Sequence, residues 1–276
     1  MKKVVLLHGF GGTSASWEPI VAMLSPEIVP YCPAISGHER PFDETSESLL
    51  SSALEQEARR LLADIEGRQM NGGLLVGYSL GARLALSMLC LEPRHFVGAI
   101  LMGVNPGLSS EPQRLERVQS DDSWAVLART VPLHTFFDHW EAQALFERQR
   151  LLPSEVLAKQ REIRLTLRSD WLAEALRQFS LGRMPDYGPG AGRLPLPIRL
   201  LAGEFDQKFT MLGMLLAQVC QQGVFISVPN SGHNVLLERP DVVVNTIQEL
   251  LTSLERQSHG DECDESRSDL ACVRGV

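Results

Sequence analysis

Three residues far apart in the chain have the types and the order needed for nucleophilic catalysis. Ser79 is the central residue of the pentapeptide GYSLG, residues 77–81, which joins a predicted strand to a predicted helix. Asp206 and then His233 follow later in the chain, each just beyond the end of another predicted strand. A serine hydroxyl needs a base, and the base needs a carboxylate that orients it, so this set predicts a Ser-His-Asp triad.

The two glycines that flank Ser79 have a physical role in such a turn. A sharp strand-to-helix turn brings Cβ atoms close to neighbouring strands, and Gly77 and Gly81 have none. The turn pushes the serine hydroxyl to the open edge of the sheet, above a helix N-terminus whose dipole favours a developing negative charge. The pattern therefore predicts a nucleophile and not an ordinary small residue in a turn.

We choose the carboxylate and the histidine that act with Ser79 by their distance from the end of a predicted strand. Asp206 comes four residues after the predicted strand 198–202, and His233 comes five residues after the predicted strand 224–228. Glu204, two positions before Asp206, is the rival carboxylate and stays open at this point. His259 also follows Asp206, but no predicted strand holds it. We therefore favour Asp206 and His233 as the partners of Ser79.

A glycine-rich segment, HGFGG at residues 8–12, follows the first predicted strand. Such a loop lets backbone amides approach a ligand closely, and we predict that the amides of Phe10 and Leu80 form an oxyanion hole. The glycine spacing matches neither G-x-G-x-x-G nor a Walker loop, which argues against a nucleotide site. A merely flexible loop is the remaining alternative.

Short β-branched runs alternate with helical patterns along the chain. This alternation predicts an α/β fold with a mostly parallel sheet of about six strands and helices on both faces. The predicted strands are Val4–Leu7, Glu27–Tyr31, Leu74–Tyr78, Val97–Met102, Ile198–Ala202 and Val224–Val228. The predicted helices of this part of the chain are Leu49–Ile65, Leu80–Leu91 and Asp241–Leu254.

Residues 107–184 interrupt the alternation, because they contain helical windows and no convincing strand. We predict a helical lid there, inserted into a core formed by residues 1–106 and 185–254. The windows are Arg114–Arg129, Leu133–Arg150, Ser154–Arg168 and Asp170–Leu181. Residues 255–276 lose apolar periodicity and carry six acidic residues against three arginines, which predicts a disordered tail.

Composition and charge exclude several classes of protein. The 276 residues are 44% hydrophobic and 22% charged, as in ordinary globular proteins, and a net charge of −8 argues against a nucleic-acid partner. No apolar run approaches the roughly 20 residues of a membrane span, and no secretory signal is evident, so we expect a cytoplasmic protein. The five cysteines lack metal-binding spacing, which predicts no metal site, and we expect Cys32, Cys90 and Cys220 to be buried thiols.

These features together resemble the α/β-hydrolase superfamily over residues 4–254. The resemblance rests on HGFGG, on GYSLG, on Asp206 and His233 in the second half of the chain, and on the helical insertion. Members usually begin with a β-hairpin before the first of these strands, whereas only Met1 to Lys3 precede it here, in keeping with about six strands.

Within the superfamily the chain resembles the family of 2-succinyl-6-hydroxy-2,4-cyclohexadiene-1-carboxylate synthases. The matching segments are GYSLGAR, NPGL, QRLERVQSDDSWA, PLHTFFDHWEAQALF, AGEFDQKF and SGHN. The resemblance implies a lyase of menaquinone or phylloquinone biosynthesis that needs no cofactor. It would eliminate pyruvate from 2-succinyl-5-enolpyruvyl-6-hydroxy-3-cyclohexene-1-carboxylate, with the triad acting as base.

The same resemblance implies the residues that bind this small polycarboxylate substrate. Arg83, Arg117 and Arg161 would bind its carboxylates, and Tyr78 and Trp140 would line the pocket. Guanidinium groups suit this task because each can hold one carboxylate through two hydrogen bonds.

Two other functions remain open. A serine hydrolase, either a carboxylesterase or a C–C hydrolase, would use the same triad through an acyl-Ser79 intermediate. A non-enzymatic receptor on this fold is disfavoured, because all three triad residues are present. The sequence indicates no oligomeric state.

Overall fold

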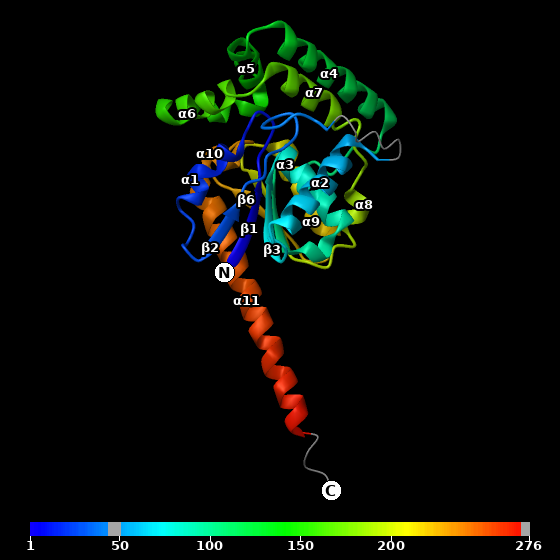
Figure 1. Ribbon diagram of the computed structural model, residues 1–276, viewed down its shortest axis with the longest axis vertical. Helices are drawn as coiled ribbons and strands as arrows, with labels where there is room; N and C mark the ends of the chain where they lie inside the picture. Colours follow the sequence, from blue (N-terminus) through cyan, green and yellow to red (C-terminus); the bar gives the residue numbers. More distant parts are fainter. Residues whose placement is uncertain (44–50, 272–276) are drawn as a thin grey trace.

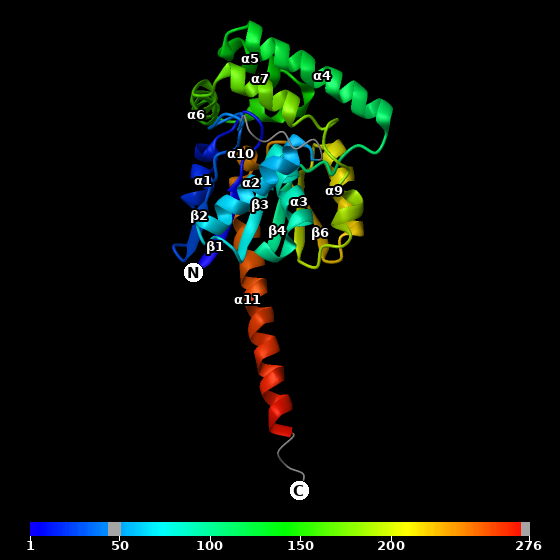
Figure 2. The same cartoon turned by 45° about the vertical axis from the view of Figure 1, so that its right-hand side comes forward.

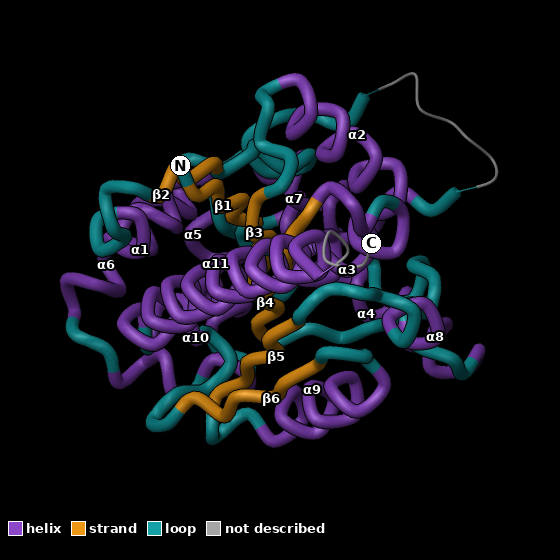
Figure 3. The backbone as a smooth tube through the Cα atoms, turned by 90° about the horizontal axis from the view of Figure 1, so that it is seen from below, coloured by secondary structure: helices purple, strands orange, loops and turns teal. Residues whose placement is uncertain are grey.

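The computed structural model describes residues 1–43 and 51–271, with side chains described for residues 1–43 and 51–257. Its centre is one sheet of six parallel strands in the order β2-β1-β3-β4-β5-β6 (Figure 3). The strands are β1 (Lys2–Leu7), β2 (Ile28–Tyr31), β3 (Gly73–Tyr78), β4 (Phe96–Met102), β5 (Ile198–Gly203) and β6 (Gly223–Val228). All six predicted strands are confirmed, with ends that shift by at most two residues.

Helices cover both faces of the sheet, as the strand sequences require. Helices α1 (Glu18–Val21) and α11 (Pro240–Ala271) lie on one face, and α2 (Ala53–Gly67), α3 (Leu80–Leu91) and α9 (Gln207–Val219) lie on the other (Figure 3). Alternate residues of each strand enter two separate apolar clusters, one on each face. Burial on both sides explains why these strands are almost entirely apolar. Of the predicted helix Leu49–Ile65, positions 49 and 50 lie outside the described residues.

The helical insertion consists of four main helices above the carboxyl ends of the strands (Figures 1 and 2). They are α4 (Glu111–Thr130), α5 (Leu133–Glu141), α6 (Ser154–Leu165) and α7 (Ser169–Gln178). The predicted window Leu133–Arg150 was wrong after Glu141, where two short 3-10 turns, Ala144–Phe146 and Arg148–Leu151, replace the helix. There the chain turns so that Phe146 and Gln149 become buried. The remaining short helices are α8 (Gly188–Ala191) and α10 (Val235–Glu238).

The last helix extends into residues 255–276, which were predicted to be a disordered tail. Helix α11 continues to Ala271 and projects beyond the sheet, at the end opposite the helical insertion (Figure 1). Its first part is anchored by the buried residues Val243, Ile247 and Leu250. Once a helix is nucleated by such docking, each further residue adds a hydrogen bond at little extra cost, so polar residues can extend it. Positions 272–276 of the predicted tail lie outside the described residues.

Two expected absences concern membranes and metals. In residues 1–43 and 51–271, no helix combines the length and apolar character needed to cross a membrane. Over the same ranges no cluster of histidine, cysteine and acidic side chains could hold a metal ion. Cys220 is a buried free thiol, whereas Cys32 and Cys90 are free thiols that are only half-buried.

Gly81 is the point at which α3 packs directly against β1, and its replacement is expected to destabilise the fold. A Cβ atom at this position would lie 2.1 Å from the carbonyl oxygen of Leu7. Because backbone and not a flexible side chain stands in the way, we expect Gly81→Ala to lower the free energy of unfolding by about 3 kcal/mol. Urea denaturation followed by circular dichroism measures this change.

The matched control is Gly67→Ala at the exposed end of α2, where no atom lies within 4 Å of the added Cβ. This change is expected to be neutral or to stabilise the protein by less than about 1 kcal/mol. Equal effects at the two glycines would contradict the packing argument.

Candidate active site

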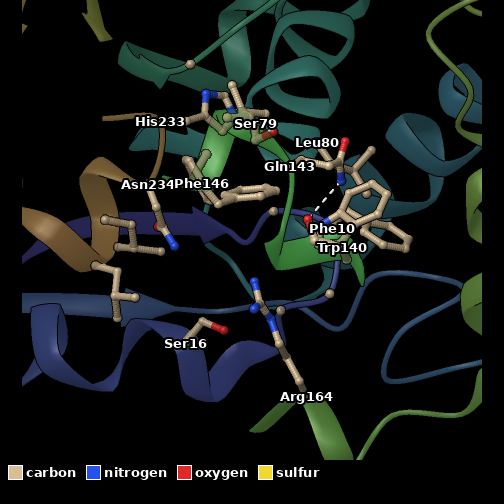
Figure 4. A pocket seen from close by; sticks show the side chains of 18 of the residues that line it. Phe10, Ser16, Ser79, Leu80, Trp140, Gln143, Phe146, Arg164, His233 and Asn234 are labelled. Atoms are coloured by element: carbon tan, nitrogen blue, oxygen red, sulfur yellow. Dashed lines mark hydrogen bonds between the residues drawn. The ribbon is translucent and has the colours of Figure 1, made fainter. Parts of the chain in front are cut away.

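The structure brings the three predicted triad residues together at the carboxyl ends of β3, β5 and β6. Figure 4 shows Ser79 and His233 side by side at the cavity. His233 Nε2 lies 3.2 Å from Ser79 Oγ, and His233 Nδ1 lies 2.7 Å from Asp206 Oδ2. Asp206 and His233 are 7% and 3% exposed, so little water competes for the bond between them. The arrangement allows a neutral imidazole to accept the Ser79 proton while the carboxylate fixes its tautomer.

The backbone of Ser79 has the strain predicted for this turn. Its φ of 50° and ψ of −105° are unusual for a residue with a side chain. The turn is so tight that a Cβ atom at Gly77 would lie 2.4 Å from the carbonyl oxygen of Gly81. The two glycines are therefore needed for the geometry that directs the Ser79 hydroxyl towards His233.

Glu204 does not contact His233. Its side chain is exposed, and its Oε2 accepts a hydrogen bond from the Asn230 amide at 3.0 Å. Asp206, in contrast, uses both oxygens, because Oδ1 accepts a hydrogen bond from the Phe209 amide at the start of α9. This cap fixes the carboxylate at the end of the helix, and the geometry favours Asp206 over its rival.

Phe10 and Leu80, whose amides were predicted to form an oxyanion hole, both line the cavity beside Ser79. Leu80 is the first residue of α3, where amides have no partner within their own helix. Within the part of the chain that the structure describes, neither amide has a backbone acceptor. Both are therefore available to an anion that forms near Ser79.

A cavity of about 750 Å³ lies between the strand ends and the helical insertion. Tyr78 and Trp140 line it, as predicted. The Tyr78 ring lies 5.6 Å from the His233 ring, and the Trp140 ring lies 4.7 Å from that of Phe10. Burial raises the pKa of the Tyr78 hydroxyl, which keeps this side chain neutral.

Arg83 and Arg117, two of the three predicted carboxylate ligands, also line this cavity. Arg83 donates a hydrogen bond to the carbonyl oxygen of Phe179 at 2.7 Å. Burial, together with the neighbouring charge of Arg117, lowers the pKa of Arg83 to about 9. A bound carboxylate would offset this unfavourable environment, because an opposite charge favours the protonated guanidinium.

Arg117 is held by Asp121, whose two carboxylate oxygens each lie 2.9 Å from its Nε. Asp121 is 3% exposed and is therefore a firm anchor for the guanidinium. The two terminal nitrogens of Arg117 have no protein partner among the described residues, and a substrate carboxylate matches them.

Arg161, the third predicted ligand, does not line the cavity; Arg164 does. Arg161 pairs with Asp138 at 2.6 Å, whereas Arg164 pairs with Glu141 and lies over the Phe137 ring. The two arginines are three residues apart on α6, and their partners have the same spacing on α5. Because Arg161 also lies 3.9 Å from Glu141, the four side chains form one connected set of ion pairs. Of these four side chains only that of Arg164, which is 4% exposed, lines the cavity.

Several further cavity residues escaped the sequence analysis. Besides Arg164, Phe146 and Phe209 line the cavity, and their rings lie 6.1 Å and 4.4 Å from that of His233. Phe209 follows Asp206 by three residues, and this short spacing is the signal that could have indicated it. Nothing in the spacing of Phe146 points to His233.

With this geometry established, comparison with known proteins identifies the family. A family model described as the alpha/beta hydrolase family matches residues 4–246. The chain belongs to the α/β hydrolase family. It is an enzyme of that superfamily, and the fold and the family implied by the sequence are both confirmed.

Its sequence is similar to enzymes with one shared name. It is 31% identical over 255 residues to 2-succinyl-6-hydroxy-2,4-cyclohexadiene-1-carboxylate synthase from Salmonella arizonae. The aligned residues make up 91% of this chain and 94% of the relative. The synthase of the same name from Enterobacter sp. (strain 638) is also 31% identical, with coverages of 90% and 91%.

Solved structures share the architecture. MenH from S. aureus superposes with a TM-score of 0.85 at 25% identity, covering 92% of this chain and 94% of the other. A thermophilic esterase from Thermogutta terrifontis gives 0.77 at 21% identity, with coverages of 92% and 90%, and this likeness concerns the fold alone.

Proposed function

We propose that this protein eliminates pyruvate from 2-succinyl-5-enolpyruvyl-6-hydroxy-3-cyclohexene-1-carboxylate, as a lyase of menaquinone or phylloquinone biosynthesis. One observation carries the proposal: a single cavity holds both a Ser-His-Asp arrangement and three inward-facing arginines, Arg83, Arg117 and Arg164. A simple ester would not need three cations, whereas a substrate with several carboxylates would. The shared name of the relatives gives independent support.

In the proposed reaction the triad removes a proton from the substrate. His233 accepts the Ser79 proton, and Ser79 Oγ then acts as the base for the acidic C–H of the substrate. The electron pair left behind forms a new ring double bond, the ring double bond already present shifts by one position, and the C–O bond to the enolpyruvyl group breaks. The released enolpyruvate becomes pyruvate by gaining a proton at carbon. No water enters the ring product, and no cofactor is required.

The Phe10 and Leu80 amides would stabilise the enolate-like charge that develops on the substrate. Oxyanion-hole donors are typically worth roughly 3 to 4 kcal/mol each in the transition state. The arginines would orient the substrate by its carboxylates, with Tyr78 and Trp140 enclosing the ring. Closing the substrate in this way brings its acidic C–H to the base.

Arg161 and Arg164, both on α6, provide a matched pair for testing substrate binding. We expect Arg164→Met to raise KM for the proposed substrate by about tenfold to a hundredfold, because one charge-assisted contact to a carboxylate is lost. Arg161→Met should change KM by less than about threefold, since Arg161 pairs with Asp138 outside the cavity. Steady-state kinetics of pyruvate release measures both, and a larger effect at Arg161 would contradict the assignment.

The proposal itself is tested by pyruvate release from the named substrate, compared with spontaneous release in the absence of enzyme. Fast, enzyme-dependent release supports the lyase. No release, together with a burst of p-nitrophenol from p-nitrophenyl acetate, would support the alternative serine hydrolase acting through acyl-Ser79. The Ser-His-Asp arrangement is the observation that keeps this alternative in view, because a serine hydrolase would use the same three side chains.

A further inference from the structure

Two buried histidines hold the glycine-rich loop that carries the Phe10 amide, and neither belongs to the triad. His8 directly follows β1, and His38 lies in the segment between β2 and α2. They are 0% and 2% exposed, and their rings meet edge to face with centroids 5.1 Å apart. Two buried titratable side chains beside a catalytic loop require a reason, because burying a polar ring costs free energy unless it is hydrogen-bonded.

The first histidine fixes the peptide plane that contains the Phe10 amide. His8 Nδ1 lies 2.9 Å from the carbonyl oxygen of Gly9, and the Gly12 amide donates to the same oxygen at 3.1 Å. In a trans peptide this carbonyl and the N–H of Phe10 share one plane and point in opposite directions. Holding the Gly9 oxygen therefore directs the Phe10 N–H the other way.

The second histidine fixes the next peptide plane. The Gly11 N–H donates to His38 Nε2 at 3.1 Å, and Gly11 has a positive φ of 70°. The ring of His38 also packs edge to face against that of Phe10, with centroids 5.4 Å apart. The peptide planes on both sides of Phe10 are thus held by the two histidines.

The protonation state of His38 follows from its partners. Because Nε2 accepts a hydrogen bond from the Gly11 amide, it carries no proton, and Nδ1–H faces the carbonyl oxygen of Ser36 at 3.3 Å. Burial, with a smaller contribution from His8, lowers the pKa of His38 to about 3. His38 is therefore neutral near neutral pH, and the hydrogen bond from Gly11 selects the tautomer with the proton on Nδ1.

The segment that carries His38 is itself anchored to helix α2. The amide and hydroxyl of Ser36 donate to the two oxygens of the Glu57 carboxylate at 2.9 Å and 2.8 Å. Arg60 pairs with the same carboxylate at 2.6 Å. Glu39, the residue after His38, accepts hydrogen bonds from Ser14, and its carboxylate lies 3.5 Å from His8 Nε2. A buried polar chain therefore runs from α2 to the loop beside Ser79.

We propose that His38 is a positioning residue of the oxyanion hole, whose neutral Nε2 holds the Gly11 amide and thereby the orientation of the Phe10 N–H. This inference rests on the proposed role of Phe10, but it makes a separate claim about loop geometry. His38 touches no reacting atom, so its removal should act on the transition state through the loop. The expected signature is a lower kcat with an almost unchanged KM.

The test compares His38→Leu with His38→Gln, whose Oε1 can accept a hydrogen bond close to the place of Nε2. We expect His38→Leu to speed hydrogen exchange of the Gly11 amide by at least about tenfold and to lower kcat for pyruvate release by about tenfold to a hundredfold, with KM within about threefold. His38→Gln should stay within about threefold of the wild type in all three quantities. The exposed His139→Gln is the matched control.

Two results would overturn the proposal: unchanged Gly11 exchange in His38→Leu, whether or not activity is lost, or equal behaviour of the leucine and glutamine variants. If the wild type releases no pyruvate, the proposed function fails, while Gly11 exchange still decides the role of His38. If His38→Leu does not fold, ¹⁵N NMR of the wild type decides, since a protonated Nε2 would contradict the assigned hydrogen bond.

Discussion

Replacement of Ser79 by alanine is expected to lower kcat for pyruvate release by about a thousandfold or more. The alanine methyl group cannot accept the substrate proton, and His233 Nε2 is separated from the substrate by the position that Oγ occupies in the wild type. General base catalysis typically contributes about a hundredfold to ten-thousandfold, which sets the size of the effect. Steady-state kinetics on the proposed substrate measures it.

The matched control for this change is Ser123→Ala on helix α4, where the hydroxyl is exposed and bonds only to the Gln119 carbonyl of its own helix. This variant should retain the wild-type rate within about twofold. A Ser79→Ala variant that kept more than about a tenth of the wild-type kcat would exclude Ser79 as the base.

The second large effect is expected for Asp206→Asn, which should lower kcat by about a hundredfold to a thousandfold. The new amide can present an N–H to His233 Nδ1, where the carboxylate accepts a hydrogen bond at 2.7 Å in the wild type. The imidazole would then take the wrong tautomer and could no longer accept the Ser79 proton at Nε2. Circular dichroism would show that the fold is retained.

Glu204→Gln tests the rival carboxylate under the same conditions. The Glu204 side chain is exposed and contacts the Asn230 amide and not His233. The kcat of the Glu204→Gln variant should therefore remain within about twofold of the wild-type value. A Glu204→Gln variant as impaired as Asp206→Asn would mean that the carboxylates exchange roles in solution.

The sheet and the triad geometry could be predicted because both follow from order along the chain. Parallel strands end at the same edge of a sheet, so residues that follow β3, β5 and β6 must meet there. Ser79, Asp206 and His233 each follow such a strand by a few residues, and the structure brings them within hydrogen-bonding distance. Glu204 differs from Asp206 only in which way the turn directs its side chain, which spacing alone cannot determine.

The sequence could not show whether Arg161 or Arg164 lines the cavity, for a related reason. Arg161 and Arg164 are three residues apart, so they lie near each other on one side of the helix. Which of them faces the cavity depends on how α6 packs against α5, through the pairs with Asp138 and Glu141. This packing is tertiary information, and helical periodicity does not contain it.

The predicted boundaries failed where tertiary contacts outweigh local preference. The window Leu133–Arg150 has helical periodicity throughout, yet the chain leaves the helix after Glu141 to bury Phe146 beside His233. The second error was a helix predicted too short. The polar residues after Leu254 stay helical because the docked part of α11 has already nucleated the helix. Local composition indicated disorder there because it contains no information about this docking.

The central claim is that the ring substrate undergoes elimination and not hydrolysis, and mass spectrometry of the products in ¹⁸O-labelled water tests it most directly. Wild-type enzyme should release pyruvate together with a ring product that is lighter by one water molecule than the hydrolysis product and carries no ¹⁸O. Ser79→Ala should form this product at least about a thousandfold more slowly than the wild type. A ring product that retains a hydroxyl at the site of cleavage, or that incorporates ¹⁸O there, would contradict the lyase and support a hydrolase.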